Sequence, residues 1–324
     1  ALIVSLSDGS EFDTLLNASI SEAAIAIGWE FAEVTGAESL ESAPAAFEEA
    51  LALNPAGIRI SGDYVDALEI QLAEAENAGV AVICTGCSGE PTGAIKDTSI
   101  DGDAQNTVWG QILSSYIIEN QSAEEVAGIE VFALPAPALL TFNLEFADNM
   151  ENLCRDCSVI ETIVDVNDLE FAPTLIADTM STSLGRWAVL DSGEISTDVP
   201  AALADALVFE PIVLIGRGAN ARDIAIMQEL AASGAVPPEK GIIDASPEAA
   251  LALQAWTGLP VPVMGWRVID QFARILAGEA LADGALPSQL LTVTNVAEAA
   301  LDESGNYLGV ADYREQFTGL WGVN

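Results

Sequence analysis

The sequence predicts an α/β protein of two doubly wound parallel-sheet lobes joined by a short hinge. The chain has 324 residues, a length that suits two domains of ordinary size. Short apolar runs alternate with stretches of helical periodicity, which is the pattern of parallel sheets covered by helices. A short polar turn at residues 100–103 separates two halves that repeat this alternation, and it is the predicted hinge.

The first third of the chain is predicted to alternate strands with helices. Each strand is a short apolar run, and each helix carries apolar residues at helical spacing and ends at a glycine or an Asn-Pro pair. The predicted strands are 1–5, 29–34, 57–60 and 80–84, and the predicted helices are 12–27, 43–53 and 65–78. Strands in this order pair in parallel through right-handed crossovers.

The middle of the chain repeats the pattern. The predicted helices are 109–118, 142–154, 173–182, 199–207 and 223–232, and the predicted strands are 129–134, 159–164, 187–190 and 212–216. The periodicity therefore predicts a second lobe of the same type as the first.

The stretch before the C-terminal region fits more than one interpretation. Residues 241–245 suit a strand and 247–254 a helix, but 251–256 suit a strand equally well. Residues 265–277 then form a clear amphipathic helix, and 290–293 suit a further strand.

The composition excludes several classes of function. The chain has 50 Asp and Glu against 10 Lys and Arg, a net charge of −40, so we expect no nucleic-acid partner. It has no His, which removes the usual general base, the Ser-His and Cys-His pairs and the commonest metal ligand. The sequence contains no glycine-rich phosphate motif either. We therefore predict no catalytic residues, no cofactor and no metal.

Four cysteines form two CxxC pairs, Cys84 with Cys87 and Cys154 with Cys157. Two local disulfides are the favoured interpretation, and free thiols, a metal site or a redox role stay open. A redox pair would be expected to open a helix, whereas a loop follows Cys87.

Polar and aromatic side chains recur where the predicted strands end. Ligands of open parallel sheets bind outside the carboxyl ends of the strands. The loops at these ends are 7–12, 61–64, 85–87, 191–194 and 216–220, and they carry acids, hydroxyls and aromatic rings. Carboxylates accept hydrogen bonds from sugar hydroxyls and aromatic faces pack on sugar rings. For any single residue, helix capping is the alternative role.

Several of these segments carry a family resemblance. They are the opening run 1–5, the helix end 27–29, the strands 57–60 and 80–84, the pair Ala255-Trp256 and the helix 264–279. Together they resemble the type I periplasmic solute-binding proteins of the ribose- and galactose-binding kind, the receptors of ABC sugar importers.

The resemblance implies a type I periplasmic binding protein fold, with an N-terminal lobe of 1–103 plus 257–290 and a C-terminal lobe of 104–256 plus 291–324. A small polar solute, a sugar or polyol, would bind between the lobes, which close by hinge motion and dock on the ABC permease. The family's ligand positions fall on Asp8, Glu11, Phe12, Thr85, Asp103, Phe142, Phe171, Asp191, Glu194, Arg217, Asn220 and Trp256. We expect an exported monomer, periplasmic or anchored on the outer side of the cell membrane.

Two alternatives stay open. The chain could be the effector-binding core of a sugar-responsive transcription regulator without its DNA-binding domain, or an enzyme that uses carboxylates or the CxxC pairs. The first predicts a basic helix-turn-helix, which this acidic sequence does not contain. A receptor requires neither histidine nor a nucleophile, so the composition favours the receptor.

Overall fold

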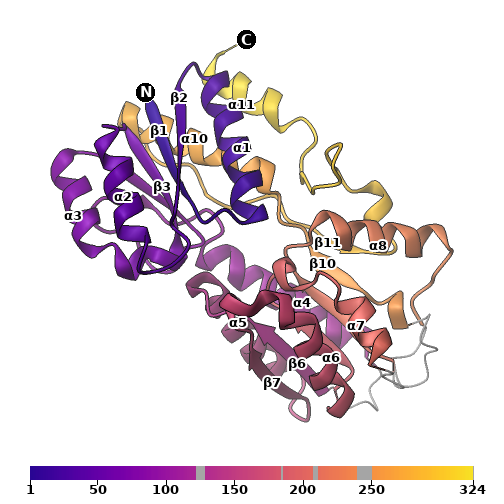
Figure 1. Cartoon of the computed structure of the whole chain (residues 1–324). Coiled ribbons are helices and arrows are strands. Elements are labelled where there is room, and N and C mark those ends of the chain that lie inside the picture. Colours follow the sequence, from indigo (N-terminus) through magenta and orange to yellow (C-terminus); the bar gives the residue numbers. More distant parts are fainter. Residues whose placement is uncertain (122–127, 184, 207–210, 239–249, 324) are drawn as a thin grey trace.

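The computed structural model describes residues 1–121, 128–183, 185–206, 211–238 and 250–323. Within these residues the chain forms two mainly parallel sheets flanked by helices, one in each of two lobes (Figure 1). The predicted fold class is therefore confirmed.

The first sheet has the order β2-β1-β3-β4-β5 in the described residues, and every pair in it is parallel. Its strands are β1 (Leu2–Ser7), β2 (Glu30–Thr35), β3 (Gly57–Ser61), β4 (Ala81–Thr85) and β5 (Ile95–Asp97). Its helices are α1 (Glu11–Ala26), α2 (Ala43–Ala52) and α3 (Glu69–Ala78), with the 3-10 turn η1 (Gly62–Ala67).

The second sheet has the order β7-β6-β8-β9-β10-β11 in the described residues. Its strands are β6 (Gly128–Ala133), β7 (Ser158–Ile163), β8 (Trp187–Leu190), β9 (Val213–Arg217), β10 (Ala255–Thr257) and β11 (Leu290–Thr292). Its helices are α4 (Asp103–Asn120), α5 (Pro137–Leu153), α6 (Ala172–Thr182), α7 (Val199–Asp205) and α8 (Ala221–Ala232), with the turns η2 (Val166–Phe171), η3 (Gly193–Ile195) and η4 (Val296–Glu298). Apart from the antiparallel β11, the strand order repeats that of the first sheet, so β3 corresponds to β8 and β4 to β9.

Helix α10 (Val261–Ala277) returns to the first lobe and lies against α1, in the upper part of Figure 1. A Cβ on Gly265 would lie 2.5 Å from the Cβ of Ser19 and 2.6 Å from the backbone nitrogen of Ile20. Only a glycine therefore allows the two helices to approach this closely.

The C-terminal helix α11 (Tyr313–Trp321) departs from the predicted lobe boundaries. The tail from 291 was assigned to the second lobe, and β11 does pair there with β10. Helix α11 instead packs on α10 of the first lobe, where the Trp321 ring stacks on Trp266 with 5.3 Å between centroids. Arg314 adds an ion pair to Glu22 of α1 at 2.7 Å. Burial of these rings explains the departure. The other predicted lobe boundaries, at residues 103, 256 and 290, remain predictions.

Other differences concern short or capped elements. The strand β5 was not predicted, and α4 begins at Asp103 instead of residue 109 because Gly102 forms its N-cap. Helix α5 begins at Pro137, a residue suited to the first turn of a helix. Around 251–256 neither interpretation holds throughout: residues 250–251 are helical, 252–253 form a turn, and β10 covers only Ala255–Thr257. The predicted strand 241–245 and residues 247–249 of the predicted helix 247–254 lie outside the described residues.

Both CxxC pairs are disulfides, as the favoured interpretation predicted. Cys84 is bonded to Cys87 and Cys154 to Cys157, each pair separated by three positions. The first bond closes the loop that follows β4 at the edge where the strands end. Among the described helices none is long and apolar enough to cross a membrane. The described residues also contain no cluster of three or more acidic or Cys side chains that could hold a metal ion.

We expect Trp266→Ala to lower the free energy of unfolding by about 3–5 kcal/mol, because it removes a large core side chain and the ring on which α11 packs. Trp266 is only 2% exposed, whereas Leu320 of α11 is 59% exposed. Leu320→Ala is the matched control and should change stability by less than about 0.5 kcal/mol. Urea unfolding measures both, and equal effects would contradict this account of the C-terminal helix.

Candidate functional site

Loops at the carboxyl ends of the two sheets approach each other. Glu194 in η3 of the second lobe has its pKa raised to about 7, first by loss of solvent and then by the charges of Asp8 and Asp63 in the first lobe. The turn η1 also contacts α5 across the lobes. We call residues 7–13, 61–64 and 191–194 the facing loops.

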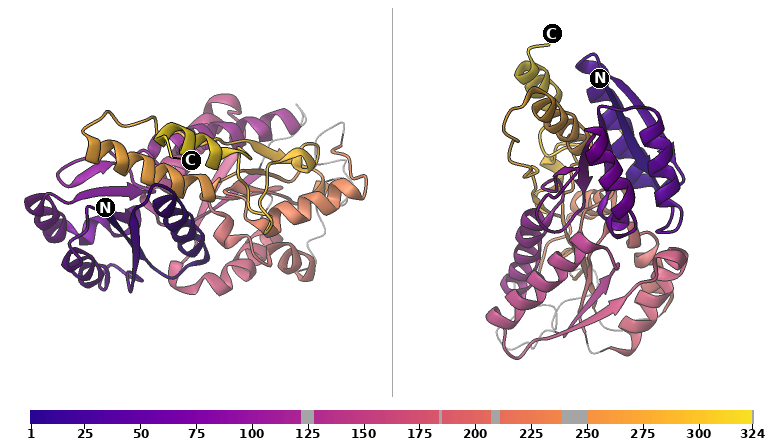
Figure 2. Two further views of the ribbon diagram at one scale, coloured as in Figure 1. Left: turned by 90° about the horizontal axis from the view of Figure 1, so that it is seen from above. Right: turned by 90° about the vertical axis from the view of Figure 1, so that its left-hand side faces the viewer.

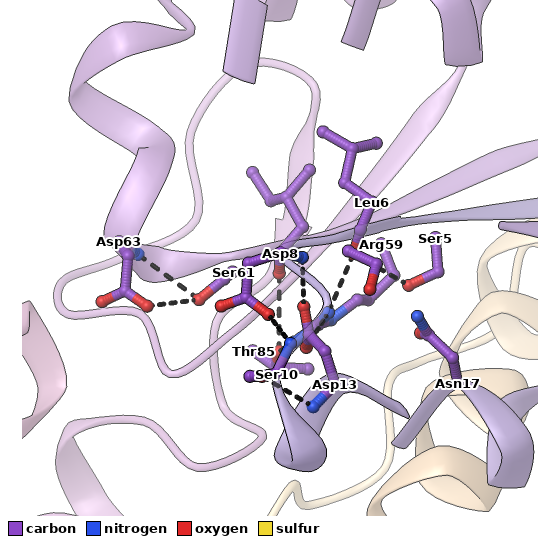
Figure 3. A network of polar contacts seen from close by, with 12 residues as sticks. Ser5, Leu6, Asp8, Ser10, Asp13, Asn17, Arg59, Ser61, Asp63 and Thr85 are labelled. Atoms are coloured by element: carbon purple, nitrogen blue, oxygen red, sulfur yellow. Dashed lines mark hydrogen bonds and ion pairs between the residues drawn. The ribbon is translucent and has the colours of Figure 1, made fainter. Parts of the chain in front are cut away.

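A buried arginine organises the first-lobe side of these loops (Figure 3). Arg59 points from β3, and its Nη1 lies 2.8 Å from Asp13 Oδ1 and 3.2 Å from the carbonyl oxygen of Leu6. Its Nε and Nη2 donate to Thr85 Oγ1 at 2.9 and 2.7 Å. One guanidinium group thus joins the ends of β1, β3 and β4 to the start of α1.

Asp13 also holds the loop after β1 in place. Its Oδ2 accepts a hydrogen bond from the backbone N–H of Asp8 at 3.1 Å. Asp8 in turn accepts from the backbone N–H of Ser10 at 2.8 Å and from the Tyr64 hydroxyl at 3.3 Å. Burial raises the pKa of Asp13, and the charge of Arg59 opposes that rise.

The two lobes build the same turn at equivalent places. Ser61 is the last residue of β3 and Asp63 follows it, whereas Ser192 and Glu194 both follow β8. A glycine separates serine and acid in both cases. Each serine caps its 3-10 turn by accepting from the backbone N–H of the acid. The result is one carboxylate per lobe, Asp63 and Glu194. Both residues keep solvent-exposed surface, but the surrounding loops displace enough water to raise the pKa of each carboxyl group.

The glycine of each turn is required by a close backbone approach. A Cβ on Gly62 would lie 2.1 Å from the carbonyl oxygen of Gly86, in the loop after β4. A Cβ on Gly193 would lie 2.1 Å from the carbonyl oxygen of Gly218, in the loop after β9. No side chain fits at such a distance, so the matching turns need glycine on both sides.

A second buried arginine connects the second lobe to the hinge. Arg217 at the end of β9 donates from Nε to Asn106 Oδ1 at 2.7 Å and from Nη2 to the carboxylate of Asp101. Its guanidinium carbon lies 4.8 Å from the centroid of the Trp109 ring. Asp101 belongs to the segment between β5 and α4, so Arg217 holds the turn that links the lobes.

Asp191 is a buried acid beneath the second-lobe loops. Its Oδ2 accepts from the backbone N–H of Leu134 and from Asn143 Nδ2, both at 3.0 Å. Its Oδ1 is buried and finds no partner among the described residues. Burial raises the pKa of Asp191 to about 7, although both hydrogen bonds and the charge of Arg217 work against the rise.

Of the predicted site residues, the structure brings Asp8 and Glu194 together at the facing loops. Asp103 lies beside the hinge, where it accepts hydrogen bonds from the backbone N–H of Gly89 at 2.8 Å and from the Thr141 hydroxyl at 2.6 Å. These bonds outweigh partial burial, so the pKa of Asp103 is lowered.

Four other predicted residues lie behind the loops and hold them through hydrogen bonds. Thr85 and Arg217 are almost fully buried in the contacts described above, and Asp191 is fully buried. Asn220 caps α8 and donates from Nδ2 to the carbonyl oxygen of Gly193 at 2.9 Å. These four side chains position the loops through hydrogen bonds within the protein, and only Asp191 keeps a buried oxygen, Oδ1, without a partner among the described residues.

The predicted aromatic residues lie elsewhere. Phe142 and Trp256 are fully buried in the apolar cores, so in this structure they present no surface to a solute. Phe171 is 59% exposed at the start of α6, and Phe12 is half-buried against the core of the first lobe. Glu11 is exposed in the first turn of α1.

The sequence analysis did not assign Arg59 or Asp13 to the site. The available signal was a single charged residue inside the apolar strand run Ile58-Arg59-Ile60, since a buried charge needs a partner. Asp63 and Tyr64 stood out at a strand end but were not assigned to the site.

A separate open depression of about 330 Å³ lies on α4 beside β11. It is lined by Val108, Gln111, Ile112, Ser115, Tyr116, Glu119 and Leu290. It contains none of the predicted site residues, so the facing loops are the better candidate.

We expect Arg59→Met to lower the free energy of unfolding by about 3–5 kcal/mol, because Asp13 would keep a buried charge without its partner. The control is Arg222→Met, since Arg222 pairs with Asp198 at 2.8 Å but both side chains are more than half exposed. That exposed pair should contribute less than about 1 kcal/mol. Urea unfolding compares the two, and a similar loss in both would contradict the role of burial.

Asp191 should make stability depend on pH. Its pKa is about 7 in the folded state against an ordinary value of 3.8, so between these values the folded protein holds a proton that the unfolded chain releases. The stabilisation is complete below pH 3.8 and is lost as the pH rises through 7. Asp191→Asn should flatten the stability profile from pH 4 to 7 measured by urea unfolding, and Asp223, also near 7, should keep some slope in both proteins. An unchanged slope would show that Asp191 is ionised throughout.

Comparison with known proteins identifies solved structures with a similar fold. No protein-family model matches the sequence. No curated protein matches it either. Many solved structures do match. One from Mycobacterium smegmatis, in complex with β-D-fucofuranose, has a TM-score of 0.71 at 14% identity, covering 99% of this chain and 97% of that one.

Two further structures are described as solute-binding proteins. An ABC transporter protein from Agrobacterium vitis with bound allitol has a TM-score of 0.71 at 15% identity, over 92% of this chain and 96% of that one. A carbohydrate transporter protein from Agrobacterium radiobacter with D-arabinose has a TM-score of 0.70 at 17% identity, over 92% and 95%. The chain therefore has the two-lobed fold of the type I periplasmic binding proteins.

Proposed function

We propose that the protein is the solute-binding receptor of an ABC transporter, which holds a small sugar or polyol between its lobes for delivery to a permease. The observation that carries the proposal is the meeting of the two sheets' carboxyl ends, each with an exposed acid, at the facing loops. Ligands of such sheets bind at this edge.

The connections between the lobes suit closure around a solute. Described segments pass between the lobes after β5, after β10, before β11 and before α11. The first of these contains Asp101, which Arg217 holds from the second lobe. Short connecting segments of this kind act as hinges in two-lobed binding proteins. Figure 2 shows the lobes one above the other, with both termini on the first.

The chemistry of the facing loops suits hydroxyl groups. Asp8, Asp63 and Glu194 offer carboxylate oxygens that accept hydrogen bonds from sugar hydroxyls. The named relatives are in complex with β-D-fucofuranose, allitol and D-arabinose, which are all small polyhydroxyl compounds. We also propose that the protein is an exported monomer that binds its solute without chemical change, and its net charge of −40 argues against a nucleic-acid partner.

A thermal-shift screen against pentoses, hexoses, polyols, amino sugars, nucleosides and amino acids tests the proposal. A solute that binds only the folded protein stabilises it by about 2.7 kcal/mol at a hundredfold excess over Kd. We expect a shift from sugars or polyols, and a lower radius of gyration in solution scattering when the solute is present.

Glu194→Gln should weaken binding of that solute at least tenfold in calorimetry, whereas Asp66→Asn should not. Asp66 is an exposed acid of η1 and loses the same charge. A shift only from nucleosides or amino acids, or no shift from any compound, would contradict the proposed sugar receptor.

A further inference from the structure

We infer that the loop closed by the Cys84–Cys87 disulfide is the pivot between the lobes, and that this disulfide positions the first-lobe facing loops for the solute. The effect on the solute rests on the proposed function, whereas the contacts of the loop do not depend on which solute binds. We call residues 84–89 the pivot loop. It covers the end of β4 and the residues that follow, at the edge where the strands of the first sheet end.

The pivot loop is bonded directly to helices of the second lobe. The Ser88 hydroxyl donates to the carbonyl oxygen of Pro137, in the first turn of α5, at 2.9 Å. The backbone N–H of Gly89 donates at 2.8 Å to Asp103 Oδ2 at the start of α4, and Asp103 Oδ1 accepts from the Thr141 hydroxyl of α5 at 2.6 Å. Two neighbouring residues of the first lobe therefore hold the starts of two second-lobe helices.

The same loop lies against the segment that links the lobes. The backbone N–H of Gly86 donates to the carbonyl oxygen of Ile100 at 3.1 Å. A Cβ on Gly102 would lie 2.1 Å from the carbonyl oxygen of Thr98 and 3.2 Å from that of Cys87, so this segment passes close to the pivot loop. Groups beside a hinge axis move little when a domain turns, so the bonds of the pivot loop to the second lobe can persist while the facing loops move.

On its other side the pivot loop supports the facing loop after β1. Thr85 lies next to the disulfide and accepts from Arg59 Nε at 2.9 Å and from Nη2 at 2.7 Å. Arg59 pairs with Asp13, whose Oδ2 accepts from the backbone N–H of Asp8 at 3.1 Å. A displacement of the pivot loop therefore reaches the loop after β1 through one guanidinium group.

The turn η1 packs on the pivot loop as well. A Cβ on Gly62 would lie 2.1 Å from the carbonyl oxygen of Gly86 and 3.1 Å from the Cα of Cys87. Cys84 is fully buried and Cys87 is 4% exposed, so the disulfide lies in the packed interior beneath this contact. The disulfide thus fixes the backbone on which η1 rests.

The second disulfide of the chain provides a matched control. A disulfide between positions so close in sequence closes a small ring, and it restricts the unfolded chain less than one that closes a long loop. Cys154–Cys157 has the same separation of three as Cys84–Cys87, so both restrict the unfolded chain to the same degree. It lies between α5 and the start of β7, at the edge of the second sheet opposite the facing loops. The two disulfides therefore differ in what they hold in the folded protein.

The test removes one disulfide at a time. The pivot variant combines Cys84→Ala with Cys87→Ala, and the control variant combines Cys154→Ala with Cys157→Ala. Circular dichroism and urea unfolding establish that each variant is folded. Amide hydrogen exchange is then followed by NMR in the absence of any solute.

The exchange rates report on the contacts of the pivot loop. In the pivot variant we expect the Gly86 and Gly89 amides to exchange roughly tenfold faster, because their bonds to Ile100 and Asp103 open more often. The Asp8 amide should exchange about threefold faster, since its bond to Asp13 depends on the pivot loop through Arg59. In the control variant all three rates should be unchanged.

Solute affinity is the second readout. Calorimetry uses D-arabinose, D-ribose, D-glucose, D-galactose and sorbitol as probes. The pivot variant should bind the tightest of these about tenfold more weakly, because facing loops that are less fixed must be ordered on binding. The control variant should bind that probe as the unaltered protein does.

Ser88→Ala tests the contact between the lobes with the disulfide intact. The Ser88 side chain is exposed, so its loss should leave folding unaffected. We expect a larger radius of gyration in solution scattering without solute, and faster exchange of the Gly89 amide. Ser233→Ala removes an equivalent bond, from an exposed serine hydroxyl to the carbonyl oxygen of Leu230 at 2.7 Å, and should change neither.

Equal exchange at Gly86, Gly89 and Asp8 in the two disulfide variants would overturn the inference. Faster exchange in the pivot variant with unchanged affinity for a bound probe would overturn it too, as would equal responses to Ser88→Ala and Ser233→Ala. If no probe binds the unaltered protein, that result counts against the proposed function, and the exchange of the Asp8 amide decides the inference separately.

Discussion

The order of the facing loops depends on the burial of a guanidinium group. An arginine in an apolar interior is tolerated only when its charge and its donors find partners. Arg59 finds them in Asp13, Thr85 and a carbonyl of β1, so four elements are joined at one point. Arg217 has the same role in the second lobe, but its partner Asp101 lies in the hinge. Each lobe therefore has a fixed loop edge, and one of them is coupled to a segment that links the lobes.

The repeated strand order explains why the two edges resemble each other. β3 and β8 occupy the same place in their sheets, so the turn after each strand lies close to the backbone of the loop after the neighbouring strand. At each of these close approaches only a glycine fits, Gly62 in the first lobe and Gly193 in the second. The serine on one side and the acid on the other of that glycine then fall at equivalent points. The carboxyl ends of the two sheets approach each other, and the charge of Asp63 raises the pKa of Glu194 across the lobes.

Periodicity was sufficient to predict most of the fold, because apolar strand runs and capped helices are local features. The three-residue β5 carries too few apolar positions to stand out, and nothing local tells Tyr313, Phe317 and Trp321 which lobe they will cover. The position of Asp8 and Glu194 in loops after strands could be predicted because loops at strand ends are recognisable in a sequence, whereas their part in binding stays a prediction. The partners of Arg59 could not, since Thr85 lies 26 positions away and Asp13 lies 46 away, and only the sheet brings them together.

The general acidity of the chain and the acids of the facing loops differ in one physical respect. Carboxylates scattered over a surface are separated by water and screened by salt, so their number alone says little about a ligand. Asp63 instead acts on Glu194 across the lobes, where its charge raises the pKa of that carboxyl group. Within each lobe, the same problem is solved by a buried arginine beside an acid. Asp63 and Glu194 have no arginine partner of this kind among the described residues, because Arg59 is paired with Asp13 and Arg217 with Asp101.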